Sequence, residues 1–259
     1  MRTFSIVRAF LYTAAGILSL VTPASAQVLE RLVVEADDVP DATLVRIRGE
    51  LDQAQERIGR FFSERGGAVR VQVFAHREAF SRALREAWGI PDTQCWMVGA
   101  ADDSHLYLLS PDIWTDEACE HDPSDEDHVR LLVTHELVHV YHGQVNPSDD
   151  IGLLEDIGWF TEGLAVYVSG QLDERQEGRA AEALASDRAP ETLDTAWSGP
   201  YRYGVTGSMV AFIDAHWGRD VLRAALSATS QPELLGLLGV TESEFLEGWR
   251  NWVEGGTSS

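Results

Sequence analysis

The sequence VRLLVTHELVHVYH, from Val129 to His142, decides the fold. Its apolar residues recur three or four positions apart, which is the spacing of one face of an α-helix. Ser124 or Asp125 precedes the stretch and can cap a helix N-terminus with a side-chain oxygen. The pattern therefore predicts one long helix over residues 125–142. The apolar residues of that face are Val129, Leu132, Val133, Leu137 and Val140.

His135 and His139 lie four residues apart in this predicted helix, so they share one face, about a turn apart. Two imidazoles in that arrangement can bind one zinc ion through their ring nitrogens. Glu136 follows the first histidine, where its carboxylate can take a proton from a water molecule on the metal. Zinc lowers the pKa of such a water to about 7. The H-E-x-x-H motif therefore predicts a zinc-dependent hydrolase with Glu136 as its general base.

A catalytic zinc ion needs a third protein ligand and an open fourth position. Glu162 is the favoured third ligand, because it is the one carboxylate in the apolar stretch WFTEGLA at 159–165, where an unpaired charge is costly. Glu155 is the alternative carboxylate. His142 lies at the end of the motif helix, where the helix dipole favours a cationic side chain. Val145 occupies the place of the third histidine of a metzincin, which excludes that class.

The rest of the chain divides into a strand-containing part and a helical part. Before the motif helix, residues 43–65 and 76–88 show helical periodicity, and residues 28–36, 69–75, 96–100 and 105–109 have the composition of strands. After it, helices are predicted over 157–170, 204–217, 220–228, 232–238 and 243–253. This segregation, without alternating βαβ units, predicts an α+β fold: a small N-terminal mixed sheet with helices, followed by a mainly helical lobe.

Residues 1–26 have the pattern of a secretory signal peptide: early arginines, an apolar run over 9–21, and Ala24 and Ala26 at a small-residue cleavage site. The apolar run is short for a span of about 20 residues, which favours a cleaved signal over an uncleaved membrane anchor. We therefore expect a periplasmic or extracellular protein.

The chain is strongly acidic and contains two cysteines. Its formal net charge of −22 excludes nucleic acid as a partner, because the phosphates would be repelled. Cys95 and Cys119 predict a disulfide, since an even number of cysteines in an oxidising compartment usually pairs. Their spacing does not fit a CxxC redox site or a cysteine zinc site.

HELVH at 135–139 followed by WFTEGLA at 159–165 resembles the gluzincins, metallopeptidases that bind zinc through two histidines and one glutamate. More narrowly, the chain is similar to short bacterial peptidase-like domains that pair H-E-x-x-H with an E-G-L-A helix. The resemblance implies a single zincin-like metallopeptidase domain over 27–259, with an α/β part at about 27–143 and a helical part at about 144–259. Weaker matches lie at 105–109, 203–210, 216–218 and 245–250.

The resemblance also implies residue roles: His135, His139 and Glu162 would bind zinc, and Glu136 would be the base. A downstream tyrosine would stabilise the oxyanion of the tetrahedral intermediate, and Tyr203 fits that position best, with Tyr201 two residues away. Residues 105–109 match the edge strand that would hold the substrate backbone by β-augmentation.

Val166 departs from the family pattern. Many gluzincins have an acid at this position, four residues after the ligand glutamate, where it orients a ligand histidine. Another group must then support the imidazole, and Asp150 and Asp156 are the candidates that we consider.

These observations together predict a secreted, monomeric zinc metallopeptidase that acts on a peptide or protein substrate and has no membrane anchor after signal cleavage. One alternative is a zincin-fold binding or envelope protein with weak or lost chemistry, which the departure at Val166 keeps open. The other is a structural protein that contains the motif by chance.

Overall fold

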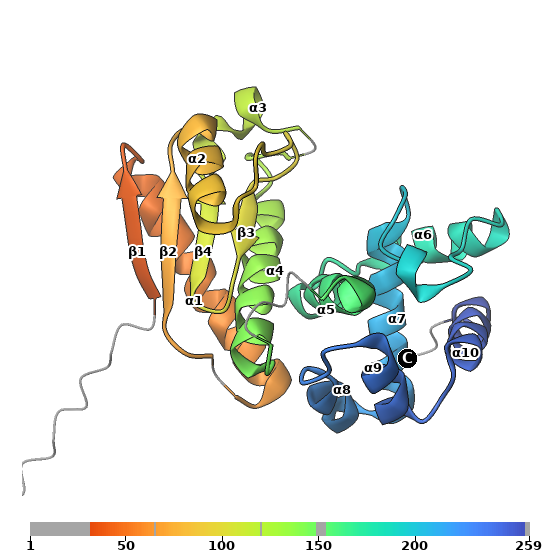
Figure 1. Ribbon diagram of the computed structural model, residues 1–259. Helices are drawn as coiled ribbons and strands as arrows, with labels where there is room; N and C mark the ends of the chain where they lie inside the picture. The colour runs from red at the N-terminus through yellow and green to blue at the C-terminus, as the bar shows by residue number, and fades with distance from the viewer. Residues whose placement is uncertain (1–31, 65, 120, 149–153, 257–259) are drawn as a thin grey trace, which may run out of the picture.

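The computed structural model describes residues 32–64, 66–119, 121–148 and 154–256, apart from the side chains of Glu126 and Glu155. The signal peptide predicted over residues 1–26 lies outside these ranges. Within them, a small mixed sheet comes first and a helical lobe follows (Figure 1), which confirms the predicted α+β fold. None of the helices in the described ranges is long and apolar enough to cross a membrane.

The N-terminal half contains a four-stranded sheet in the order β1-β2-β4-β3. β1, β2 and β4 are parallel, and β3 pairs antiparallel with β4. A helix, α1 (Asp41–Phe62), connects β1 with the parallel strand β2, so this half contains a βαβ unit, whereas the sequence predicted an α+β fold without alternating βαβ units. The sequence did not indicate this unit because β1 is half-exposed and lacks the continuous apolar run that is typical of a parallel strand. The strands are β1 (Leu32–Asp37), β2 (Val69–Phe74), β3 (Gly99–Ala101) and β4 (His105–Leu109).

The strand over residues 105–109 is not the edge strand that its family resemblance implied. It lies between β2 and β3, so β3 forms the edge of the sheet next to the motif helix. Asp102 closes the turn between β3 and β4, because its Oδ1 accepts the backbone N–H groups of Ser104 at 2.8 Å and His105 at 2.6 Å. Any substrate strand added to this side of the sheet would therefore pair with β3.

Helices cover both faces of the sheet. On one face lies α2 (Arg77–Trp88), where Phe80 contacts Phe74 and Trp88 contacts Tyr107, ring against ring. On the other face lie α1 and the motif helix α4 (Glu126–Val145) (Figure 1). The long helix predicted over residues 125–142 is thereby confirmed.

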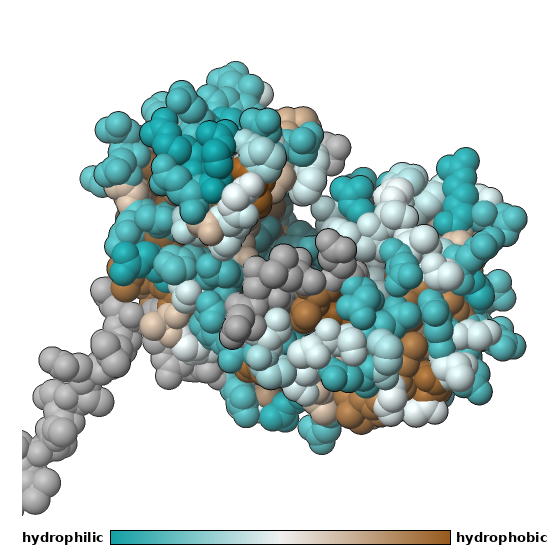
Figure 2. All heavy atoms as spheres, in the orientation of Figure 1, coloured by the Kyte–Doolittle hydropathy of each residue, from teal (hydrophilic) through white to brown (hydrophobic). Residues whose placement is uncertain are grey.

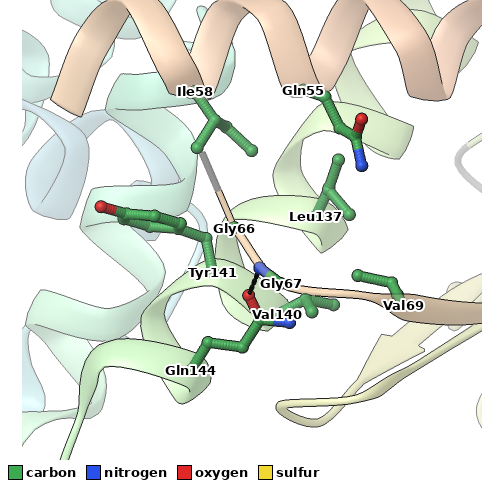
Figure 3. A pocket seen from close by; sticks show the side chains of 9 residues that line it. All are labelled: Gln55, Ile58, Gly66, Gly67, Val69, Leu137, Val140, Tyr141 and Gln144. Atoms are coloured by element: carbon green, nitrogen blue, oxygen red, sulfur yellow. Dashed lines mark hydrogen bonds between the residues drawn. The ribbon is translucent and has the colours of Figure 1, made fainter. Parts of the chain in front are cut away.

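The sheet-facing side of α4 closes a small cavity against α1 and β2, lined by Ile58, Val69 and Leu137 among others (Figure 3). Gln144, at the C-terminal end of α4, reaches across it. Its Oε1 accepts the N–H of Gly67 at 2.6 Å, and its Nε2 donates to the carbonyl of Asp103 at 2.8 Å. These bonds tie α4 to two turns of the sheet.

The C-terminal half is helical. The helix α5 contacts α4 on one side and α7 on the other. Helix α6 was not predicted from the sequence; the other long helices were, within a few residues. The helices are α5 (Gly158–Ser169), α6 (Glu174–Ala185), α7 (Arg202–Trp217), α8 (Arg219–Ala225), α9 (Gln231–Leu238) and α10 (Glu242–Glu254), with the short 3-10 turns η3 (Glu155–Ile157) and η4 (Leu193–Thr195). A further 3-10 turn, η1 (Pro111–Ile113), follows β4 in the N-terminal half.

Glycines allow α5 and α7 to approach closely. A Cβ atom on Gly163 would lie 2.4 Å from the carbonyl oxygen of Thr206, and one on Gly207 would lie 2.7 Å from a methyl carbon of Val166. Since real Cβ atoms do not approach backbone so closely, larger residues would push the helices apart. This contact fixes α5, which carries Glu162, at the junction of the two halves. Figure 2 shows that the surface is hollowed between these halves.

The predicted disulfide between Cys95 and Cys119 is present. It joins Cys95, in the segment before β3, to Cys119, which lies two residues after the end of α3 (Trp114–Glu117). The guanidinium of Arg77 braces the same place by donating to the carbonyls of Cys95 at 3.1 Å and Glu117 at 2.8 Å. The bridge fits a location outside the reducing cytoplasm.

Candidate metal centre

His135, His139 and Glu162 converge where α4 meets α5. The Nε2 atoms of the two histidines are 3.1 Å apart. Oε2 of Glu162 lies 3.4 Å from Nε2 of His135 and 3.6 Å from Nε2 of His139. In the described part of the chain, this is the only group of three or more metal-ligating side chains whose ligand atoms all lie within 4.8 Å of one another.

The spacing of these three atoms fits a tetrahedral metal ion. With metal–ligand distances of about 2.0–2.1 Å, tetrahedral geometry places neighbouring ligand atoms about 3.3–3.4 Å apart. The observed separations of 3.1, 3.4 and 3.6 Å bracket that value. Two imidazole nitrogens and one carboxylate oxygen are also a donor set that zinc accepts. The three residues can therefore hold a metal ion without rearranging their backbones.

The charges of the three side chains support one another. Burial opposes ionisation of Glu162, but the charge of His139 and the hydrogen bonds from both histidines outweigh it and hold its pKa well below the usual range. Burial lowers the pKa of His139, but the carboxylate of Glu162 outweighs this effect and the net shift is upward. The side chain of Glu162 is 28% exposed against 9% for His135, so the group opens to solvent on the Glu162 side.

Glu136 lies against the edge strand of the sheet. A Cβ atom on Gly99 would lie 2.7 Å from Cγ and Cδ of Glu136, so any larger residue in β3 would displace this carboxylate. Burial raises the pKa of Glu136; the positive charges of His135 and His139 oppose the rise, and the charge of Glu162 adds to it. Its carboxylate is thus placed between the candidate ligands and the edge of the sheet that β3 forms.

The ring of His135 has a partner on its other nitrogen. Nδ1 lies 2.8 Å from Oε1 of Gln171, which follows α5 and its terminal glycine. Asp156, which we considered for this role, instead accepts the backbone N–H of Gln231 at 3.2 Å. Asp150 lies outside the described residues. The support that the sequence left unassigned is therefore given to His135 by an amide.

Val166 cannot support a ligand histidine, and the packing explains why. Its side chain is fully buried and lies against Gly207 of α7. A carboxylate at this position would have to displace apolar packing between α5 and α7, at the cost of burying a charge. The departure from the gluzincin pattern thus coincides with a tightly packed helix contact.

Tyr203 lies within reach of the charges of the candidate site. Burial raises the pKa of Tyr203; nearby Arg202 lowers it, and the negative charges of Glu162 and Glu136 raise it further. Charges act in this way only over a short distance. The hydroxyl of Tyr201 donates to Oε1 of Glu182 at 3.0 Å, on α6.

His142, one of the other two ligand candidates, does not join the group. His142 is buried, and its Nε2 donates to the carbonyl of Leu226 at 3.2 Å. Burial and the charge of His139 lower the pKa of His142 to about 4, so it is neutral at pH 7 and our interpretation of a cation favoured by the helix dipole is wrong. The side chain of Glu155 lies outside the described part of the structure.

Gln171 and Gly99 are the residues of the site that the sequence did not reveal. Gln171 is 36 residues from its partner His135, and nothing in a single sequence pairs the two. The terminal glycine of α5 marks the end of that helix, but it does not indicate where the next side chain points. Gly99 resembles any glycine near a turn.

Comparison with protein-family models found no match, and a search of curated proteins found no similar sequence. The resemblance to the gluzincins therefore stays a prediction that rests on HELVH at 135–139 and WFTEGLA at 159–165.

Proposed function

We propose that this protein is a zinc metallopeptidase that hydrolyses peptide bonds. The observation that carries the proposal is the convergence of three ligand atoms, from His135, His139 and Glu162, at the spacing of a tetrahedral metal site. Glu136 adjoins that group on the side of the edge strand. A metal site without chemistry would not need a half-buried carboxylate in this place, since removing an unpaired charge from water is costly.

The residues divide the reaction between them. Zinc, when bound, supplies a Lewis acid that polarises the peptide carbonyl and makes water more acidic. The carboxylate of Glu136 takes the proton of the attacking water and returns it to the nitrogen of the leaving amine. The hydroxyl of Tyr203 donates a hydrogen bond to the oxyanion that develops on the carbonyl oxygen. The backbone of β3, as the sheet edge, offers unpaired N–H and C=O groups to an extended substrate.

We also propose that the enzyme acts in the periplasm or outside the cell, as a monomer on peptide or protein substrates. The disulfide between Cys95 and Cys119 supports this location. The net charge of −22 argues against nucleic acid as a partner.

The test compares wild type with Glu136→Gln, using metal content by mass spectrometry and cleavage of a mixed peptide library. We expect about one zinc ion per chain in both proteins. Cleavage by the variant should fall by about 10²–10⁴-fold, because the amide cannot take the proton. Asp127→Asn on the same helix, where the carboxylate is exposed and paired with Arg130, is the matched control and should cleave like wild type.

The outcomes separate the competing functions. A wild type that binds zinc but cleaves no peptide would indicate a binding or envelope domain on the same fold. A wild type that takes up no zinc after chelation and re-addition would contradict the metal site itself. Unchanged cleavage by Glu136→Gln would show that another group is the base.

A further inference from the structure

The contact between His135 and Gln171 fixes which ring nitrogen carries the proton. Oε1 of Gln171 has no hydrogen and can only accept, so Nδ1 of His135 must donate across their 2.8 Å separation. The opposite ring nitrogen, Nε2, then points at the Nε2 of His139 and at Glu162. The amide thus presents His135 in the orientation, and with the Nδ1–H tautomer, that a metal bound at Nε2 requires.

The chain segment that holds Gln171 is itself braced from several directions. Gly170 ends α5 with a φ of +89°, and the N–H of Gln171 then donates to Oγ of Ser169 at 3.3 Å. From α1, the guanidinium of Arg57 donates to the carbonyl of Val168. A Cβ atom on Gly170 would lie 2.8 Å from Nη2 of the same arginine. These contacts hold the backbone of the α5–α6 connection, so the side-chain amide of Gln171 is fixed in position next to His135.

An amide in this role differs in charge from the carboxylate that often supports a ligand histidine. A carboxylate makes the imidazole more basic and adds a negative charge near the metal. Gln171 gives the same hydrogen bond without the charge, and the acid position of the family pattern is filled by buried Val166. The group of two histidines, one glutamate and one amide therefore places less negative charge around a bound metal than the same group with a supporting carboxylate would.

We propose that Gln171 is the positioning residue of the metal centre: it holds His135 through Nδ1 and, being neutral, leaves the bound metal with a weaker hold and stronger Lewis acidity than a carboxylate would. The inference rests on the metal site of the proposed function, and it does not depend on peptide hydrolysis. It assigns to an amide on the α5–α6 connection the part that an acid on the ligand helix has in the related pattern.

The experiment measures zinc affinity by chelator competition, and the visible absorption of the Co²⁺-substituted protein, in wild type, three Gln171 variants and one control variant. Gln171→Met keeps the length of the side chain and removes the acceptor, so we expect zinc affinity to fall about 10–100-fold and the cobalt bands to shift. Gln171→Glu restores the acceptor and adds charge, so its affinity should exceed that of wild type. Gln171→Leu repeats the removal with a different shape, in case methionine sulfur itself binds the metal.

Gln144→Leu is the matched control, because it removes a glutamine at the C-terminal end of α4 that forms hydrogen bonds with Gly67 and Asp103 and is not a neighbour of His135 in the ligand group. It should lower the melting temperature of the metal-free protein and leave zinc affinity unchanged, whereas Gln171→Met and Gln171→Leu should lower zinc affinity and leave that melting temperature unchanged. Melting curves of the metal-free proteins report any loss of fold separately from loss of metal.

Each outcome decides the inference. Wild-type zinc affinity and cobalt bands in both Gln171→Met and Gln171→Leu would overturn it, as would a Gln171→Glu variant that binds zinc as weakly as they do. Weak binding by the first two with restored binding by the third would establish it. Failure of the wild-type protein to bind either metal would instead refute the proposed function, which keeps the two failures distinct.

Discussion

Two histidine pairs lie along the same part of the chain, and they use their ring nitrogens differently. In the clasp pair, Nδ1 of His121 lies 2.8 Å from Nε2 of His128, and Nε2 of His121 lies 2.8 Å from the carbonyl of Trp96. In the metal pair, His135 and His139 direct both Nε2 atoms at one point. The ring nitrogens of the clasp pair (His121 and His128) form hydrogen bonds, whereas the two Nε2 atoms of the metal pair (His135 and His139) are placed so that both could bind one metal ion.

The third partner makes the difference. Glu162 joins the metal pair from α5, and within the described ranges no comparable carboxylate completes a ligand group with the clasp pair. The clasp pair instead packs against Trp114, whose ring lies 5.2 Å from that of His121 and 6.1 Å from that of His128. Proximity of two histidines alone therefore does not give three ligand atoms, whereas convergence with a carboxylate gives a group that could hold a metal ion.

The largest effect should come from removing that carboxylate. Glu162→Gln replaces the charged ligand by a neutral amide, and zinc affinity should fall by more than the 10–100-fold expected for loss of an outer hydrogen-bond partner. His128→Asn, which removes one member of the clasp pair, should keep about one zinc ion per chain. Metal content after dialysis measures both. Zinc retained by Glu162→Gln, or lost from His128→Asn, would break the distinction between the pairs.

The next effect tests whether the metal pair serves catalysis as well as binding. Tyr203→Phe removes the hydroxyl near Glu136 and Glu162, and kcat on peptides should fall about 10²–10³-fold with metal content unchanged. Tyr201→Phe is the control, because its hydroxyl bonds to Glu182 on α6. Equal kcat values for the two variants would remove Tyr203 from the reaction.

Reduction of the disulfide should lower the stability of the loop that carries the clasp pair without changing zinc binding at the metal pair. Cys119 lies two residues before His121, and its bond to Cys95 closes a loop with a sequence separation of 24. In the chain-entropy model, opening such a loop lowers the free energy of unfolding by about 3 kcal/mol. Chemical denaturation of the reduced protein measures this loss. Zinc affinity should stay unchanged, and its loss on reduction would show that the loop supports the metal pair too.

The sequence predicted the parts of the fold that repeat over many residues. α1 and α4 show regular apolar spacing over about 20 residues, so their existence and place were predictable. α6 escaped because its buried face consists of Ala180 and Ala183, which give a weak apolar signal. The pairing of β1 with β2 escaped because strand order depends on contacts between distant segments.

The same division holds for the candidate site. The convergence of His135 and His139 follows from helical spacing alone, and the apolar surroundings of Glu162 predicted a cation beside it. Gln171 depends on how α5 ends, and Gly99 depends on how closely β3 approaches α4. Residues that act through local spacing can be predicted, and residues that act through the meeting of separate elements require the structure.

The smallest effect should come from the clasp pair itself. His128→Asn removes the bond between Nδ1 of His121 and Nε2 of His128, while the contact of His121 with Trp96 can remain. Loss of one such hydrogen bond lowers the free energy of unfolding by about 0.5–1.5 kcal/mol. Chemical denaturation of wild type and His128→Asn, each with the disulfide oxidised and reduced, gives the four free energies of a double-mutant cycle. Because the bridge at Cys119 and the clasp pair restrain the same segment, their effects should couple rather than add. Strictly additive losses would show that the two histidines hold something other than this loop, and the contrast with the metal pair would then need a different basis.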